Sequence, residues 1–269
     1  MTIMNEKLLA CTDQGNGPPL VLLHGFPLSR KMWKTQVEEW SRDFRVIAPD
    51  FRGFGGSALA AEFSMTGCAE DVHELLASLG IQDGVVLLGL SMGGYISFEF
   101  VRRYQGMLRG LILVATQPAA DSDTSRQARY ETAEFVRREG SSALAERLIP
   151  RFLGKTTLAT TTDVAEVVRS LIQSNAREAI AQACYGLAAR RDSTPLLPNI
   201  KIPTLIVAGS EDALISPTQA ETMQREIPHS KLSVVEQCGH MVNLEQPHEL
   251  NQIVTSFLEE LGTSPHSRG

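Results

Sequence analysis

Ser91 stands in a glycine-rich stretch whose residue types suit nucleophilic catalysis. The stretch Gly89-Leu90-Ser91-Met92-Gly93 fits the pattern G-x-S-x-G, and it lies between an apolar run and a helical pattern. In that context the serine occupies a sharp strand-to-helix turn that lifts its hydroxyl above the edge of a sheet, and glycines are needed because the two backbones approach closely. The alternative is a serine that only caps the helix in a glycine-rich turn. We predict that Ser91 is a nucleophile.

A serine hydroxyl is a weak nucleophile until a base removes its proton, so a histidine must lie within reach. His240 follows the last apolar run and precedes the last helical pattern, which places it in a loop at the carboxyl end of a strand. His24 lies too close to the first core strand to serve as the base. The remaining histidines fall in a helical pattern, a turn, a helix start and the tail: His73, His229, His248 and His266. We predict that His240 is the base.

The acid that orients this histidine is predicted to be Asp212. It follows the apolar run 204–208, again at the carboxyl end of a strand. The order nucleophile, acid, base along the chain is the one used by α/β sheets with this type of serine turn. A carboxylate that merely caps the next helix is the non-catalytic alternative. The competing acids are Glu211 and, more remotely, Asp121 or Asp123.

Two backbone N–H groups are candidates for stabilising the oxyanion that forms when a serine attacks a carbonyl. Backbone donors suit this task because they are held in place before the reaction. Met92 begins the helix after Ser91, where the helix dipole adds partial positive charge. Phe26 lies in the loop after LLHG, and Gly25 lets that loop turn toward Ser91. We expect the N–H groups of Phe26 and Met92 to form the oxyanion hole.

An open α/β sheet is predicted to position these residues. Its apolar runs are mostly continuous in Val, Leu and Ile, which is typical of strands buried on both faces of a parallel sheet. Amphipathic helical stretches alternate with the runs, so we expect a mostly parallel central sheet with helices on both faces, and an antiparallel hairpin at its edge in residues 1–18. The predicted strands fall within residues 19–24, 44–50, 84–91, 108–116, 203–212 and 231–240.

Residues 117–192 interrupt the alternation with helical sequence rich in Ala, Arg and Glu. This stretch is too long for an ordinary connection, so we predict a helical cap over the carboxyl ends of the strands, where open sheets bind ligands. Extra packing on the sheet is the alternative. The core would then comprise residues 1–116 and 193–262, with a disordered tail at 263–269. Candidates for the pocket roof are Phe135, Leu148, Phe152 and Leu187.

The predicted cap carries ten arginines, any of which could bind a carboxylate of the substrate. Most are expected to lie on solvated helix faces. They are Arg126, Arg129, Arg137, Arg138, Arg147, Arg151, Arg169, Arg177, Arg190 and Arg191.

Composition excludes several classes of partner. A formal net charge of −6 argues against a nucleic-acid-binding protein, which needs a basic face. No apolar run approaches the length of a membrane span, and the start of the chain lacks the pattern of a signal peptide, so we expect a cytoplasmic protein. The four cysteines are scattered without metal-ligand spacing, which predicts reduced thiols and no metal site. The sequence does not indicate an oligomeric state.

Five stretches, in this order, carry a family resemblance: HGFP, PDFRGFGGS, GLSMGG, GSEDALISP and GHMVNLEQP. Through these stretches the chain resembles the serine hydrolases of the α/β-hydrolase fold over nearly its whole length. Among those hydrolases it is similar to the esterase and 3-oxoadipate enol-lactonase-like group. The resemblance implies a Ser91–Asp212–His240 triad, an acyl-enzyme intermediate and no cofactor. It also implies a small soluble ester or lactone that enters under the cap.

Other functions share the same residues. Cofactor-free perhydrolases or haloperoxidases and carbon–carbon bond hydrolases use a serine triad as well, and a receptor-like binding protein keeps the pocket but turns over slowly. Haloalkane dehalogenases and epoxide hydrolases are disfavoured because they need a carboxylate nucleophile where this chain has Ser91. The fold alone does not name a substrate. We therefore expect ester or lactone hydrolysis, with these alternatives open.

Overall fold

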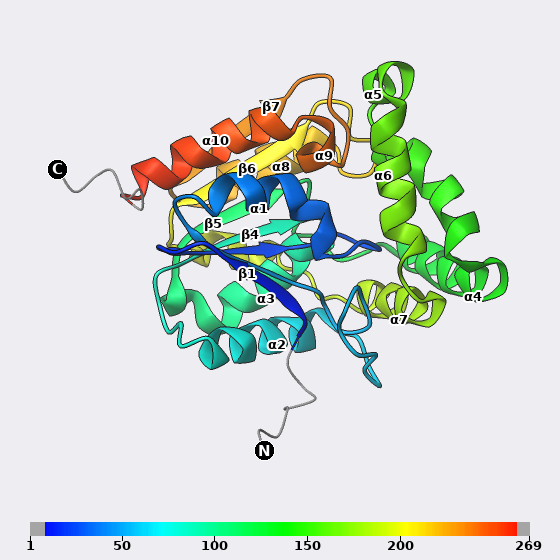
Figure 1. Ribbon diagram of the computed structural model, residues 1–269, viewed down its shortest axis with the longest axis horizontal. Helices are drawn as coiled ribbons and strands as arrows, with labels where there is room; N and C mark the ends of the chain where they lie inside the picture. The colour runs from blue at the N-terminus through cyan, green and yellow to red at the C-terminus, as the bar shows by residue number, and fades with distance from the viewer. Residues whose placement is uncertain (1–8, 263–269) are drawn as a thin grey trace.

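The long apolar runs form the strands of one sheet. The computed structural model describes residues 9–262 (Figure 1), and the sheet within them has the strand order β1-β3-β2-β4-β5-β6-β7. Only β1 runs antiparallel to its neighbour, so the predicted α/β class with a mostly parallel sheet is confirmed. The strands are β1 (Cys11–Gln14), β2 (Pro19–Leu23), β3 (Arg45–Pro49), β4 (Val85–Leu90), β5 (Leu108–Val114), β6 (Thr204–Gly209) and β7 (Ser230–Val235).

Burial on both faces explains why the strands inside the sheet, β2 to β6, are apolar with little alternation. In β2, Leu20 and Leu22 pack into the core on one face of the sheet, whereas Val21 and Leu23 pack into the core on the other. Successive side chains of a strand point to opposite faces, so a sheet covered on both sides needs an apolar residue at every position.

Helices cover both faces. In Figure 1, α1 and α10 lie on one side of the sheet, and α2 and α3 lie on the other. The helices of the sheet layers are α1 (Lys34–Trp40), α2 (Met65–Ser78), α3 (Met92–Tyr104), α8 (Pro217–Glu226), α9 (Val242–Glu245) and α10 (Pro247–Glu260). Short 3₁₀ turns lie at Arg30–Trp33, Gln105–Met107 and Thr194–Asn199.

A group of helices stands beyond one end of the sheet, on the right of Figure 1. Its members are α4 (Asp123–Phe152), α5 (Lys155–Thr160), α6 (Thr162–Gln173) and α7 (Arg177–Ala188). Gly140 breaks α4 into two helical segments with a φ of 86°, a conformation that glycine adopts without a side-chain clash. We call these four helices the cap.

Two of the expectations fall wholly or partly outside the described residues. The tail at 263–269 and the first arm of the predicted edge hairpin lie there. The described part of that region forms β1, which pairs with β3 at the sheet edge. None of the described helices combines the length and apolarity needed to cross a membrane.

His24 is fully buried where two loops leave the carboxyl edge of the sheet. Its Nε2 accepts a hydrogen bond from the backbone N–H of Phe51 (3.0 Å), so the ring proton sits on Nδ1, which donates to the carbonyl of Gly25 (3.0 Å). Burial lowers the pKa of His24 from 6.5 to about 4. A second ring proton would face the Phe51 N–H, which cannot accept it. Neutral His24 therefore ties the two loops together.

This arrangement predicts a loss of stability in acid. The pKa of His24 is lower in the folded than in the unfolded chain, so its contribution is complete above pH 6.5 and is lost as the pH falls toward 4. The free energy of unfolding of the wild type should drop by about 1–2 kcal/mol more than that of His24→Gln between pH 7 and pH 5. Urea unfolding of both proteins at the two pH values measures this difference. Parallel pH dependence in the two proteins would contradict it.

Candidate active site

Ser91 occupies the turn between β4 and α3 in a conformation that serine rarely adopts. Its φ is 54° and its ψ is −110°. Such a backbone costs free energy and persists only where its surroundings impose it. Here the N–H of Ser91 donates to the carbonyl of Val114 (2.9 Å), and its carbonyl accepts from the hydroxyl of Thr116 (2.9 Å). The end of the neighbouring strand β5 thus holds the turn.

Three glycines allow α3 to approach the sheet closely. A Cβ on Gly93 would lie 2.2 Å from the carbonyl oxygen of Leu23 in β2, and a Cβ on Gly89 would lie 2.4 Å from the carbonyl oxygen of Gly93. A Cβ on Gly94 would lie 2.4 Å from the Thr116 hydroxyl. These contacts are far inside van der Waals distance, which is the physical reason for the G-x-S-x-G-G sequence.

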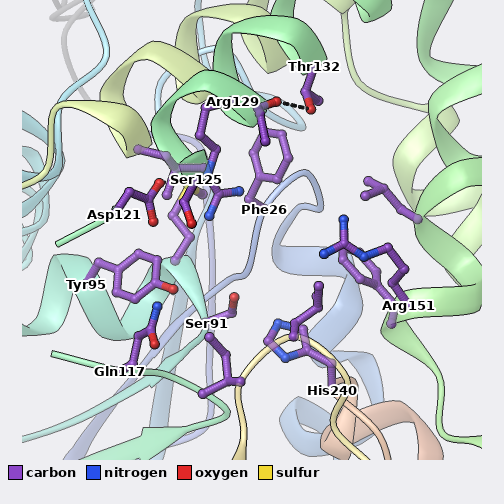
Figure 2. Close-up of a pocket in the computed structure, with 17 residues that line it drawn as sticks. Phe26, Ser91, Tyr95, Gln117, Asp121, Ser125, Arg129, Thr132, Arg151 and His240 are labelled. Carbon is purple, nitrogen blue, oxygen red and sulfur yellow. Dashed lines mark hydrogen bonds and ion pairs between the residues drawn. The ribbon is translucent and has the colours of Figure 1, made fainter. Parts of the chain in front are cut away.

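Asp212 and His240 meet at the carboxyl ends of β6 and β7. His240 Nδ1 lies 2.7 Å from Asp212 Oδ2, and both side chains are almost completely buried. The other carboxylate oxygen accepts from the backbone N–H groups of Leu214 (2.8 Å) and Ile215 (2.9 Å), which fixes its orientation. With Nδ1 turned to Asp212, the other ring nitrogen is left for the cavity that His240 and Ser91 both line (Figure 2).

Glu211, the rival acid, has a different partner. Its carboxylate accepts from the N–H (2.8 Å) and the hydroxyl (2.7 Å) of Thr156 in α5. The backbone hydrogen bond from Thr156 lowers the pKa of Glu211. Of the remoter rivals, Asp121 is bound by two arginines, and exposed Asp123 pairs with Arg126. Of the candidate acids, Asp212 is the one that contacts His240.

Glu245, in α9, holds the loop of Gly239 and His240 against the cap, a role that is not predictable from the sequence. One of its oxygens accepts from the N–H of Gly154 (2.8 Å), the hydroxyl of Thr157 (2.7 Å) and the N–H of Gly239 (3.1 Å). The backbone N–H of His240 also donates to the carbonyl of Phe152, the last residue of α4 (2.8 Å). No motif marks Glu245, because its partners in the cap, Gly154 and Thr157, lie about 90 residues away in the chain.

The backbone N–H groups of Phe26 and Met92 are the predicted donors of an oxyanion hole. Both residues line the cavity and are buried. Met92 is the first residue of α3, where a helix leaves its N–H groups without an acceptor of its own. Neither N–H donates to a loop or turn carbonyl of the described chain. Two buried donors without such partners suit an anion that forms during a reaction.

The cavity above Ser91 has a volume of about 210 Å³. Three of the four residues predicted for its roof do line it: Leu148, Phe152 and Leu187. Phe135 does not, because its ring packs under the guanidinium of Arg147 (3.4 Å) beside a separate surface hollow. Within residues 9–262, no group of three or more His, Cys, Asp or Glu side chains is placed to hold a metal ion.

A match to a known family agrees with this geometry. The family model described as alpha/beta hydrolase fold matches residues 18–247, which is most of the chain. The chain belongs to the alpha/beta hydrolase family. The match begins just before β2 and ends where α10 begins, so the inserted cap lies inside it.

Other alpha/beta hydrolases resemble this one along most of its length. The structure of a thermophilic esterase from Thermogutta terrifontis with malate bound is 43% identical, covers 94% of this chain and 93% of that one, and superposes with a TM-score of 0.91. The 3-oxoadipate enol-lactonase 1 of Acinetobacter baylyi is 29% identical over 91% of this chain and 90% of its own. The 2-hydroxymuconate semialdehyde hydrolase of Pseudomonas putida is 30% identical over 92% of this chain and 89% of its own.

The close approach of α3 to the sheet predicts a sharp difference between two glycine substitutions. In Gly93→Ala the new methyl group meets the Leu23 carbonyl, so the turn must open, and we expect a loss of about 2–3 kcal/mol in the free energy of unfolding. Gly106→Ala is the control, because nothing lies within 4 Å of a Cβ there. Thermal unfolding should show Gly93→Ala melting several degrees below Gly106→Ala. Equal melting temperatures would contradict the contact.

Proposed function

We propose that this alpha/beta hydrolase is a serine hydrolase that cleaves a carboxylic ester or lactone of a small soluble substrate through an acyl-enzyme intermediate. The observation that carries the proposal is the 2.7 Å contact between buried His240 and Asp212 beside the same cavity as Ser91. A nucleophile, a base within the same cavity and an acid that orients the base are the three groups that acyl transfer needs.

The first half of the proposed reaction forms the acyl-enzyme. Neutral His240 removes the proton from the Ser91 hydroxyl as the oxygen attacks the carbonyl carbon of the substrate. The negative charge moves to the carbonyl oxygen, which the N–H groups of Phe26 and Met92 stabilise. When the tetrahedral intermediate collapses, His240 gives its proton to the leaving oxygen. Asp212 stays ionised and stabilises the imidazolium.

The second half repeats these steps with water. His240 takes a proton from a water molecule, whose oxygen attacks the acyl carbon, and returns the proton to Ser91 Oγ as the acid is released. Backbone hydrogen bonds from Ser91 N–H to the Val114 carbonyl and from His240 N–H to the Phe152 carbonyl hold both residues in place, which supports this scheme.

The size of the cavity and the relatives both support a small substrate. Cavities for drug-sized ligands have volumes of about 300–1,000 Å³, and this one is smaller. The relative with the highest identity among those described above is an esterase, and another is a lactonase. A short acyl chain or a small lactone ring fits these observations.

Carbon–carbon bond hydrolysis is a second candidate. It uses the same triad, and the 2-hydroxymuconate semialdehyde hydrolase is as similar to this chain as the lactonase is. Turnover of simple alkyl esters with negligible cleavage of vinylogous diketones would favour the ester hydrolase, and the reverse pattern would favour the second candidate.

The first prediction from this mechanism concerns the nucleophile. Ser91→Ala should reduce kcat for p-nitrophenyl acetate by about a thousandfold or more, because the members of a triad act as a unit. The side chain projects into the cavity and not into the core, so the thermal unfolding curve should stay close to that of the wild type. A variant that folds and hydrolyses the ester at the wild-type rate would exclude Ser91 as the nucleophile.

The second prediction distinguishes the two neighbouring acids. Asp212→Asn should fold and yet lose about a thousandfold or more in kcat, since the amide cannot hold and stabilise the imidazolium as the carboxylate does. Glu211→Gln is the matched control, because its carboxylate binds Thr156 and not His240. Steady-state kinetics of both variants on one ester measures the difference. Large loss in Glu211→Gln with activity retained in Asp212→Asn would assign the acid to Glu211.

A further inference from the structure

One arginine of the cap differs from all the others in having no partner. Seven of the ten pair with carboxylates: Arg126, Arg129, Arg137, Arg138, Arg169, Arg190 and Arg191. Arg177 donates to the carbonyl of Arg137, and Arg147 stacks over Phe135. Within residues 9–262, the guanidinium of Arg151 alone among the ten has no carboxylate, carbonyl or aromatic ring as a partner.

Arg151 also lies in the one place where a free cation matters for catalysis. It stands one residue before the end of α4 and lines the cavity that contains Ser91 and His240. Figure 2 shows Arg129 and Arg151 reaching into this cavity from opposite sides. Arg151 is an exposed residue, but its guanidinium points into the space where the substrate must bind.

The other charged groups of the cavity leave an excess of positive charge. Asp121 is the carboxylate that Arg129 binds (3.0 Å), and the same carboxylate also pairs with buried Arg190. A single negative charge is thus shared between two guanidiniums. Asp212 adds one negative charge beside neutral His240, but it does not line the cavity, and the three guanidiniums of Arg129, Arg151 and Arg190 still outnumber the two carboxylates. Nothing in the described cavity neutralises Arg151, although the whole chain carries a net charge of −6 that would repel anions elsewhere on its surface.

We propose that the substrate carries a carboxylate besides its scissile ester or lactone group, and that Arg151 binds this carboxylate. A guanidinium presents a planar fork of N–H donors that matches the two oxygens of a carboxylate. Arg129, held by Asp121, adds positive charge on the opposite side. The inference rests on the proposed function, because it names the class of substrate that the Ser91 site accepts.

The test compares two esters that differ in charge and hardly in shape. Monomethyl glutarate is anionic at neutral pH, and methyl 4-carbamoylbutanoate replaces its carboxylate by a neutral amide. The wild type should have the higher kcat/KM for the anion. In Arg151→Gln the ratio of the two kcat/KM values should fall about 10- to 100-fold, which is the worth of a charge-assisted hydrogen bond, and the change should be mainly in KM. Arg151→Lys should retain part of the preference.

Arg147→Gln is the matched control. Arg147 lies one helical turn earlier on the same helix, is exposed and carries the same charge, but its guanidinium packs on Phe135 outside the cavity. It should leave the ratio unchanged. Added NaCl should lower the preference of the wild type for the anion, because salt screens an exposed ion pair, and should have little effect on the ratio in Arg151→Gln.

The outcomes separate this inference from the proposed function. If both esters are hydrolysed but the wild type shows no preference for the anion, or if Arg151→Gln and Arg147→Gln change the ratio equally, the inference is wrong and the hydrolase assignment stands. If neither ester nor p-nitrophenyl acetate is hydrolysed, the proposed function itself fails. Binding of monomethyl glutarate to Ser91→Ala, measured by calorimetry with and without Arg151→Gln, tests the carboxylate site without turnover. Equal affinities would overturn it.

Discussion

The contact between the first turn of α3 and the backbone of β2 is the constraint on which the site depends. With no side chain on Gly93, the helix approaches the Leu23 carbonyl so closely that the turn before it must take the conformation of Ser91, with a φ of 54°. That conformation sets Ser91 on the cavity wall, directly before Met92, the first residue of α3. A site built on such a turn is rigid because the surrounding sheet, and not the serine itself, determines its geometry.

A second feature is the set of hydrogen bonds that joins the cap to the loops of Asp212 and His240. Glu211 reaches from the end of β6 to Thr156, and Glu245 joins Gly154 and Thr157 to Gly239. The cap therefore contacts the same loops that carry Asp212 and His240. Because these carboxylates accept from several N–H and hydroxyl groups at once, any movement of α5 would have to break a local network. Hydrogen bonds thus join the cap to the loops that hold Asp212 and His240.

Much of this follows from the sequence, and the remainder has a physical reason. Continuous apolar runs predict the strands, because a strand buried on both faces has no polar positions, and strand ends place Ser91, Asp212 and His240 at one edge. Phe135, a candidate for the pocket roof, packs with Arg147 instead, since helical periodicity indicates that a side chain is buried but not which neighbours it contacts. Arg151 could not be separated from nine other arginines, because its distinction is the absence of partners in space. The roles of the three catalytic residues stay predictions.

The central claim is that Ser91 forms a covalent intermediate with help from His240. Its most direct test is intact-protein mass spectrometry after reaction with an alkyl fluorophosphonate, followed by peptide mapping. The account predicts one adduct per chain, located on Ser91, and much slower labelling when His240 is changed to alanine. A wild-type protein that folds and remains unlabelled, or one labelled at another residue, would contradict the account.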